Sequence, residues 1–344
     1  SDVCSSDLVD QAGAADQLND ERLTAGQMCR MPLSGREIRI MWYNVENLFH
    51  PSDDSLPADD EFTPGGARHW TWGRYRNKLT ALAKVIVAAG EWEPPEVVGL
   101  GEIENDSVLD DLVNHPILRG CGYSYLHRDS PDHRGMDVAL LYREKRFRVV
   151  EWKVHQSPAG DRFSATRGMM HVSGCWGRGD TLDLLVVHLI SRYSGTGATA
   201  VYRHQQAQQL ARLVDSVRLK RRHPLILLTG DFNEDPGGYS LQPLREDNGR
   251  GDSIREVITE GTGSYKYRGV WEKIDRFMVA GEEHWYRFSG KVLEMPALLI
   301  PDETYGGDRP DRTYLGYRYR GGVSDHLPIV ITIRRRLVPG GSGL

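Results

Sequence analysis

The sequence lacks two features that would point directly to a membrane protein or a serine hydrolase. No apolar run reaches the roughly 18 residues that a membrane-spanning helix needs, since the best stretch, TLDLLVVHLI, is short and contains an aspartate and a histidine. No GxSxG motif occurs, which argues against a serine hydrolase with a nucleophile elbow. We therefore expect a soluble protein, and its compartment stays open.

The chain also has few cysteines and no net positive charge. The four cysteines show no CxxC spacing, so neither a zinc motif nor a disulfide framework is indicated, and Cys121 and Cys175 are expected to be buried as small hydrophobic side chains. The formal net charge is −5, so the chain lacks the basic excess that attracts nucleic acid nonspecifically. This weakens the case for a nucleic-acid substrate but leaves room for one, because a local basic groove needs no overall positive charge.

One large folded domain is expected over residues 37–336. A hydrophobic content of 39% is enough for a single large core in a chain of this length. Residues 1–36 are polar and rich in Asp, Gln and Ala, and we expect a disordered or non-native leader there. The tail, residues 337–344, is expected to be flexible.

Short apolar runs typical of β-strands recur along this domain. The apolar spacing also predicts one helix over residues 74–89, ended by Gly90, and a second over residues 199–220. Two helices among many strands predict an α/β fold, with layered sheets that carry helices on their outer faces. The expected strands cover residues 37–45, 96–103, 136–143, 147–154, 181–189, 224–232, 273–280 and 327–333.

Polar clusters follow directly after five of these runs, where an α/β scaffold presents side chains to a crevice. An Asp or Asn after a strand is by itself most often a turn former or a helix cap. Together, however, the clusters supply the carboxylate and amide oxygens that Mg²⁺ or Mn²⁺ prefers, and two imidazoles able to transfer protons. The clusters are Asn44 to Asn47, Glu102 to Asn105, His188, Asp231 to Asn233, and Asp325 with His326, and Asp275 adds a carboxylate inside an apolar run.

The motifs around these clusters resemble those of the endonuclease/exonuclease/phosphatase superfamily. MWYNVENLF, VVGLGEIEN, RGMDVALLYR, VVHL, LTGDFN, KIDRFMV and SDHLP occur in the family's order and span nearly the whole expected domain. The resemblance implies a four-layer α/β sandwich, in which two packed mixed β-sheets are flanked by helices. It also implies an enzyme that hydrolyses a phosphate ester or phosphodiester with Mg²⁺ or Mn²⁺.

The resemblance further implies a role for each site residue. Asn44, Glu102 and Asp325 correspond to the metal site, with Glu102 as direct ligand. Asp231 and Asn233 correspond to the pair that orients or deprotonates the attacking water and holds the phosphate. Three further residues complete the implied catalytic set: His326, which activates water or stabilises the phosphate, Asp275, which fixes the tautomer of His326, and His188, which protonates the leaving oxygen.

One position departs from the family pattern. The family usually carries Gln directly before the metal-binding glutamate, and this chain has Gly101 there. Because Gln at that position supports the network around the metal, we expect altered contacts behind the metal ligands.

Four further residues are candidates for substrate binding. Arg134 and Asp137 lie at the start of a strand, where an arginine can hold a phosphate with two hydrogen bonds. Arg192 lies just past His188, and Arg203 lies at the start of the second predicted helix. The alternative, that Arg134 simply lies in a solvent-exposed loop without binding substrate, is nearly as common for an arginine in such a position.

The sequence leaves two classes of substrate open. A nucleic acid is one, and a phosphomonoester, a sphingolipid or an inositol phosphate is the other. A binding module that keeps the fold without catalysis is the non-enzyme alternative, and its signature would be loss of Asp231, Asn233 or His326. All three residues are present, which favours an enzyme. We expect the protein to act as a monomer.

Overall fold

The computed structural model describes residues 35–52, 59–91, 93–132, 134–157, 166–177, 179–192, 196–246 and 253–336. The expected tail therefore lies outside the described residues, as does all of the expected leader except its last two residues. Within the described ranges, no helix is long and apolar enough to cross a membrane.

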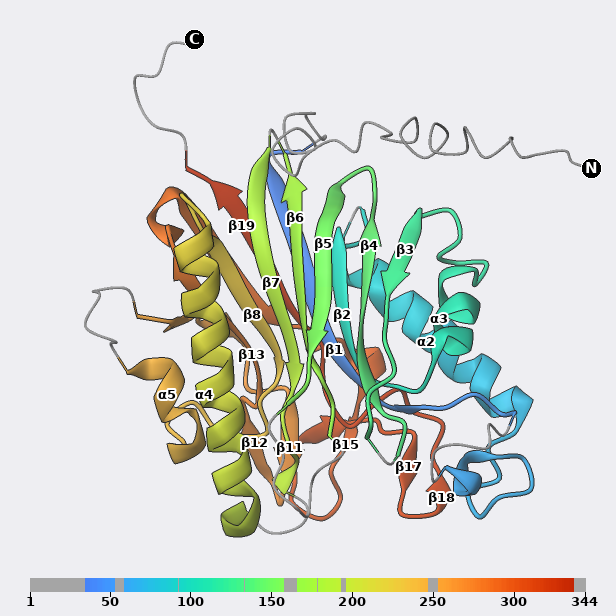
Figure 1. The fold of residues 1–344 in the computed structure, drawn as a ribbon. Helices are drawn as coiled ribbons and strands as arrows, with labels where there is room; N and C mark the ends of the chain where they lie inside the picture. Colours follow the sequence, from blue (N-terminus) through green and yellow to red (C-terminus); the bar gives the residue numbers. More distant parts are fainter. Residues whose placement is uncertain are drawn as a thin grey trace, which may run out of the picture.

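Two mixed β-sheets pack face to face at the centre of the molecule (Figure 1). The expected architecture of the α/β class, a sandwich of two mixed sheets flanked by helices, is confirmed. In spatial order the seven-stranded sheet contains β10 (Thr259–Glu260), β14 (Tyr286–Val292), β19 (Ile329–Arg335), β1 (Glu37–Leu48), β2 (Val97–Ile103), β4 (Asp137–Arg143) and β3 (Tyr123–Leu126). The six-stranded sheet contains β5 (Phe147–His155), β6 (Met169–Trp176), β7 (Asp180–His188), β8 (Leu225–Asp231), β13 (Asp275–Gly281) and β9 (Arg255–Glu256).

Helices cover the outer faces of both sheets (Figure 1). α2 (Trp72–Ala89) and α3 (Asp106–Val113) lie on the side of the seven-stranded sheet, and α4 (Thr196–Lys220) and the short α5 (Gln242–Arg245) lie on the side of the other. Strand β8 shows why both faces are buried. Leu225 and Leu227 belong to the core between the sheets, whereas Ile226 and Leu228 alternate with them and pack with α4.

All eight strands and both helices expected from the sequence are present, with boundaries shifted by a few residues. The expected burial of the cysteines is confirmed for Cys175, which is 1% exposed. It was wrong for Cys121, a free thiol that is only partly buried. Several elements had no clear sequence pattern, among them β3, β6, β14 and α3.

Three small hairpins gather at one end of the sandwich (Figure 1). They are β11 (Tyr265–Tyr267) with β12 (Val270–Glu272), β15 (Leu299–Pro301) with β16 (Asp308–Pro310), and β17 (Tyr314–Leu315) with β18 (Arg318–Tyr319). Tyr265 forms an isolated β-bridge with His326, which brings the first hairpin to the strand ends. The polar clusters named above lie at this end.

A buried ion-pair cluster on the outer side of the six-stranded sheet gives a prediction about stability. Burial raises the pKa of Asp183, but hydrogen bonds from His171, Arg221 and Ser173 outweigh burial and bring the pKa to about 2. A carboxyl whose pKa falls on folding stabilises the folded state above its unfolded pKa, and this contribution disappears as the pH falls from about 4 to about 2. We expect Asp183→Asn to lower the free energy of unfolding at pH 7 by on the order of 2 kcal/mol in urea titrations.

The same difference should shrink at the acid end of that window. Asp215→Asn is the control, since Asp215 is 28% exposed and pairs with Arg218 at i,i+3 within one helix, and such a helical pair contributes roughly 0.5 kcal/mol or less. Equal losses of stability for the two variants at pH 7 would contradict the prediction.

Candidate functional site

Three of the predicted site residues form a row across the six-stranded sheet. Strands β7 and β8 are parallel and pair His188 with Asp231, and β13 is antiparallel to β8 and pairs Asp275 with Asp231. Residues in register on neighbouring strands point to the same face of a sheet. The strand pairing alone therefore brings the two acids and the histidine together.

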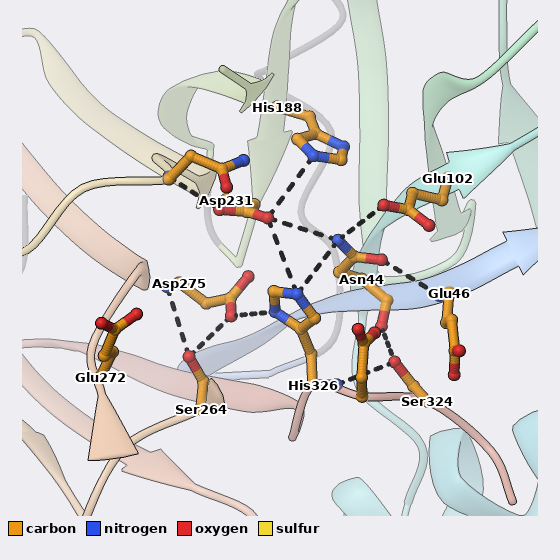
Figure 2. A network of polar contacts seen from close by, with 12 residues as sticks. Asn44, Glu46, Glu102, His188, Asp231, Ser264, Glu272, Asp275, Ser324 and His326 are labelled. Carbon is orange, nitrogen blue, oxygen red and sulfur yellow. Dashed lines mark hydrogen bonds and ion pairs between the residues drawn. The ribbon is translucent and has the colours of Figure 1, made fainter. Parts of the chain in front are cut away.

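The seven-stranded sheet supplies the facing side of the site. Asn44 pairs with Gly101 on the parallel strand β2, directly before Glu102, and His326 lies just ahead of β19. Asn44 Nδ2 lies 3.3 Å from both Glu102 Oε1 and Asp231 Oδ2. Figure 2 shows these side chains converging from both sheets, with Asn44 linking the two groups.

Asp231 is the centre of this network. Its Oδ2 lies 3.5 Å from His188 Nε2 and 3.9 Å from His326 Nε2, and its Oδ1 accepts a hydrogen bond from the backbone N–H of Asn233 at 2.8 Å. Burial and the charge of Asp275 raise the pKa of Asp231 to about 7. A carboxylate with a pKa near neutrality is well matched to take up and release a proton at physiological pH.

His326 is held by Asp275 from the opposite side. His326 Nδ1 and Asp275 Oδ2 are 2.6 Å apart, and Ser264 Oγ and Trp42 Nε1 also donate hydrogen bonds to Asp275, at 2.6 and 2.7 Å. Burial alone would lower the pKa of His326, but the charge and hydrogen bond of Asp275 outweigh it and raise the pKa to about 10. The imidazole is therefore cationic at neutral pH, with Nε2 directed at Asp231.

The second histidine has the opposite character. Burial, then the charges of Arg167 and Arg134, hold the pKa of His188 well below its ordinary value. Its side chain is only 2% exposed. The site thus contains one cationic and one neutral imidazole on either side of Asp231, and this difference comes from their neighbours.

Backbone strain is concentrated at the acidic side of the site. Glu46, Asn47, Glu102 and Asn233 all have φ between 49° and 65°, a region that non-glycine residues adopt only at a cost. They make up four of the seven such residues in the described ranges. For Glu102 the strained conformation brings Oε2 within 2.8 Å of the backbone N–H of Asn47, so the carboxylate is fixed by the neighbouring strand.

Asp325 lies beside a second buried acid, Glu46. Arg312 donates to Asp325 Oδ2 at 2.8 Å and to Glu46 Oε1 at 3.4 Å, and the backbone N–H of Thr313 donates to Glu46 Oε2 at 2.7 Å. Burial and the charge of Asp325 raise the pKa of Glu46 to about 7. Lys78 is buried here as well and donates to the backbone carbonyl of Glu46.

The donor set fits a divalent cation. The pKa values of Asp231 and Glu46 are raised first by burial and then by neighbouring carboxylates, so the site gathers several acids in a desolvated space. Oxygen donors are the ligands that Mg²⁺ and Mn²⁺ prefer. Among the described residues, one cluster at this site has ligand atoms within 4.8 Å of one another, formed by Asp231, Asp275 and His326.

Asn233 and Arg134 lie close to the predicted catalytic set. Asn233 Nδ2 donates to the carbonyl of Leu189 at 3.1 Å, which fixes this side chain just beyond His188. Arg134 is 43% exposed, lies 3.6 Å from Asp132, and its charge acts on His188. A charged side chain that is both exposed and close to the site can reach a bound anion.

The other three candidates for substrate binding are engaged with the protein itself. Arg192 forms ion pairs with Glu272 and Asp235. Arg203 is fully buried and donates to Thr199 Oγ1 at 2.7 Å and to the carbonyl of Ile190 at 3.3 Å. Asp137 is 3% exposed and accepts a hydrogen bond from the backbone N–H of Ser130 at 3.0 Å.

Sequence reasoning missed several contributors to the site, and Arg167 is the most notable. It is 4% exposed, donates to the carbonyl of Leu189 at 3.4 Å, and lies 3.9 Å from Asp132. Its Nε makes no hydrogen bond with any residue in the described ranges. The motif TRGMM gave no signal, because only the fold brings this arginine to His188. Lys78, Trp42 and Ser264 were missed for the same reason.

Gly101 is explained by its contact with Trp42. A Cβ at position 101 would lie 2.8 Å from Trp42 Cη2, and Gly99 has a similar contact at 3.0 Å. The indole ring therefore lies against a strip of bare backbone on β2, and its Nε1 can reach Asp275. A small residue at position 101 and a large one at position 42 together allow Trp42 to support Asp275 from behind.

We expect Gly101→Ala to destabilise the protein by about 1–3 kcal/mol and to lower kcat, because the indole must move away from Asp275. The measurements are urea unfolding and steady-state kinetics. Gly120→Ala is the control, since a Cβ there meets no atom within 4 Å. Adding Trp42→Phe should recover part of the lost stability but not the activity, and a Gly101→Ala variant with unchanged stability and rate would refute the contact as the cause.

Comparisons with known proteins concern the fold and the family of the chain. Curated proteins give no significant sequence match. Among solved structures, a humanized D. rerio TDP2 has 15% identity and a TM-score of 0.55, covering 87% of this chain and 100% of that one. The human Nocturnin catalytic domain with bound sulfate has 15% identity and a TM-score of 0.53, covering 88% and 96%. ANGEL2, a 2′,3′-cyclic phosphatase, has 12% identity and a TM-score of 0.55, covering 88% and 96%.

At these identities the likeness to solved structures shows the fold, and the family assignment comes from the sequence model. The model for the Endonuclease/Exonuclease/phosphatase family matches residues 39–335, most of the chain. The chain therefore belongs to the endonuclease/exonuclease/phosphatase family.

Proposed function

We propose that this protein is a divalent-metal-dependent hydrolase of phosphodiesters. The observation that carries the proposal is the placement of Asp231 Oδ2 3.9 Å from His326 Nε2, with the pKa of Asp231 raised to about 7 and that of His326 to about 10. A phosphodiester is anionic and repels hydroxide, so its hydrolysis needs a base to activate water and positive charge to stabilise the phosphoryl oxygens. The two side chains supply these properties side by side.

Asp231 is the residue we assign to the attacking water. Its carboxylate accepts a proton from water as the water oxygen bonds to phosphorus and the bond from phosphorus to the leaving oxygen breaks, and the leaving oxygen takes its proton from solvent water. The backbone N–H of Asn233 holds the other carboxylate oxygen in place. His326 donates a hydrogen bond from Nε2 to a phosphoryl oxygen, and Asp275 keeps the other ring nitrogen protonated.

His188 is placed on the same side of the substrate as Asp231. In phosphoryl transfer the attacking and leaving oxygens lie roughly in line on opposite sides of phosphorus. Because His188 Nε2 is only 3.5 Å from Asp231 Oδ2, it is badly placed to reach the leaving oxygen. We therefore assign His188 to a phosphoryl oxygen, together with Arg167 and Arg134, rather than to protonation of the leaving group.

The acidic side of the site is where we place the metal ion. Glu102, Asp325 and Asn44 would hold it, joined by Glu46 once Arg312 releases that carboxylate. When bound, Mg²⁺ or Mn²⁺ supplies Lewis-acid stabilisation of the oxygens around phosphorus.

The substrate class follows less directly from the site. Arg134 and Arg167 add positive charge beside the row of His188, Asp231 and Asp275, here called the catalytic row. This charge suits a phosphodiester flanked by further phosphates, as in nucleic acid. A lipid or small-molecule phosphoester is the alternative, and we propose a soluble monomer in either case. A substrate panel separates these possibilities.

Metal removal is the first test of the proposed function. Purified protein treated with EDTA should lose hydrolysis of bis-nitrophenyl phosphate to background and regain it with Mg²⁺ or Mn²⁺. The panel then compares plasmid DNA, RNA, sphingomyelin and inositol phosphates under the same conditions. Activity on sphingomyelin or inositol phosphates alone would show that nucleic acid is not the substrate. If none of the panel were hydrolysed in a metal-dependent way, the proposal would be refuted.

A further inference from the structure

A second cluster of potential metal ligands lies away from the catalytic row, at the loop between β3 and β4. His127 follows directly after β3, Asp129 lies on the loop, and Asp137 begins β4. One ligand atom from each of the three lies within 4.8 Å of the other two. Because antiparallel pairing joins β3 to β4, the sheet fixes the two ends of this loop.

The surroundings of His127 favour a positive charge beside its ring. Its side chain is 1% exposed, and its Nδ1 lies 2.9 Å from Asp106 Oδ1, at the first residue of α3. If Nδ1 donates its proton to Asp106, Nε2 carries the lone pair. That buried Nε2 has no hydrogen-bond partner among the described residues, and it lies 4.0 Å from Asp137 Oδ2.

A nitrogen lone pair and a carboxylate that face each other across 4.0 Å are stabilised by a positive charge between them, which either a proton on Nε2 or a bound cation supplies. The separation is too long for a hydrogen bond and suits two ligands of one cation, whose bonds are about 2.0–2.2 Å each. Asp137 Oδ2 also accepts a hydrogen bond from the backbone N–H of Ser130 at 3.0 Å. Asp129 is the third donor: its Oδ1 lies 3.9 Å from His127 Nδ1 in the structure, and its side chain is 84% exposed, so it is free to turn toward Nε2 and water can complete the coordination.

We propose that His127, Asp129 and Asp137 bind a second divalent cation, separate from the catalytic site. His127 binds through Nε2, and Asp106 holds the ring by its other nitrogen, as second carboxylates commonly do for histidine ligands. One imidazole with two carboxylates favours Zn²⁺ or Mn²⁺ over Mg²⁺ and Ca²⁺, which prefer oxygen ligands alone.

The cation would fix the loop that supports the arginines of the catalytic site. Asp132 lies on this loop and is 3.6 Å from Arg134 and 3.9 Å from Arg167. Both arginines lower the pKa of His188, so they lie close enough to influence the reacting groups. A cation at the base of the loop would therefore order the side chains that we assign to the phosphoryl oxygens.

The test is direct measurement of metal binding to metal-stripped protein, by titration calorimetry and by elemental analysis after dialysis against Zn²⁺ or Mn²⁺. We expect Asp129→Asn, an exposed substitution that leaves the core intact, to weaken one class of site by about tenfold to a hundredfold. His127→Gln should abolish that class, while Glu102→Gln, which alters only the catalytic site, should retain it. His223→Gln is the control for zinc bound by a surface histidine, because His223 pairs with a single carboxylate, Glu282.

Thermal unfolding gives a second measurement that does not depend on enzyme activity. Zn²⁺ or Mn²⁺ should raise the Tm of the Glu102→Gln variant and should fail to raise that of a Glu102→Gln, Asp129→Asn double variant, since a ligand stabilises only a state that binds it. If Asp129→Asn and His127→Gln bound the metal with unchanged affinity and stoichiometry, the second site would be ruled out, whatever the outcome for catalysis.

Discussion

Asp231→Asn should lower kcat by about 10³-fold or more while leaving the Tm within a few degrees of the wild type. The amide keeps the size of the side chain and can still accept the hydrogen bond from Asn233, but it cannot take a proton from water. Removing a buried group whose pKa is raised by other acids also relieves repulsion, so no large loss of stability is expected. Steady-state kinetics on bis-nitrophenyl phosphate with excess Mn²⁺ measure the effect.

His326→Ala should have an effect of similar size, and the double variant should be little worse than either single one. Groups that act as a unit give such strongly non-additive losses. Asp180→Asn is the control, because Asp180 is the first residue of β7, at the opposite end of that strand from His188. Wild-type rates for both single variants, or simple multiplication of their effects, would show that the two residues do not act together.

Sequence reasoning picked out residues at strand ends that the structure brings together. Each of His188, Asp231 and Asp275 is marked by an apolar run, and the resemblance to the family suggested the set. What places the three in one row is the strand order β7, β8, β13, which depends on pairing between distant segments. Local periodicity carries no information about such pairing, so contact between these residues could only be inferred from the resemblance.

Other parts of the fold and site had no local signal. α3 is only eight residues long and was not recognised, although Asn105 caps its N-terminus by accepting a hydrogen bond from the backbone N–H of Val108. β6, with the sequence MMHVSGCW, mixes glycine, serine and histidine into a strand because both of its neighbours shield it. Arg167 and Lys78 are buried cations that a sequence reading assigns to the surface, and only the acids around them account for their burial.

Asp275→Asn is the most informative substitution behind the catalytic row. Asp275 receives three hydrogen bonds, from His326 Nδ1, Ser264 Oγ and Trp42 Nε1, and an amide can accept only on its single oxygen. If its NH₂ group faced His326, the ring would have to move its proton to the other nitrogen, and the charge beside Asp231 would be lost. By analogy with the acid of a catalytic triad, kcat should fall by about 10³- to 10⁴-fold with KM little changed.

The ring nitrogens of His326 provide a readout that a merely structural role of Asp275 would not change. In ¹⁵N NMR spectra the wild type should show Nδ1 protonated, and Asp275→Asn should show Nδ1 deprotonated with the fold intact. Trp42→Phe is the graded comparison, because it removes one of the three donors and leaves His326 paired, so a loss of about tenfold is expected. If Asp275→Asn lost no more activity than Trp42→Phe, Asp275 would be a packing residue, and the cationic state of His326 would have another origin.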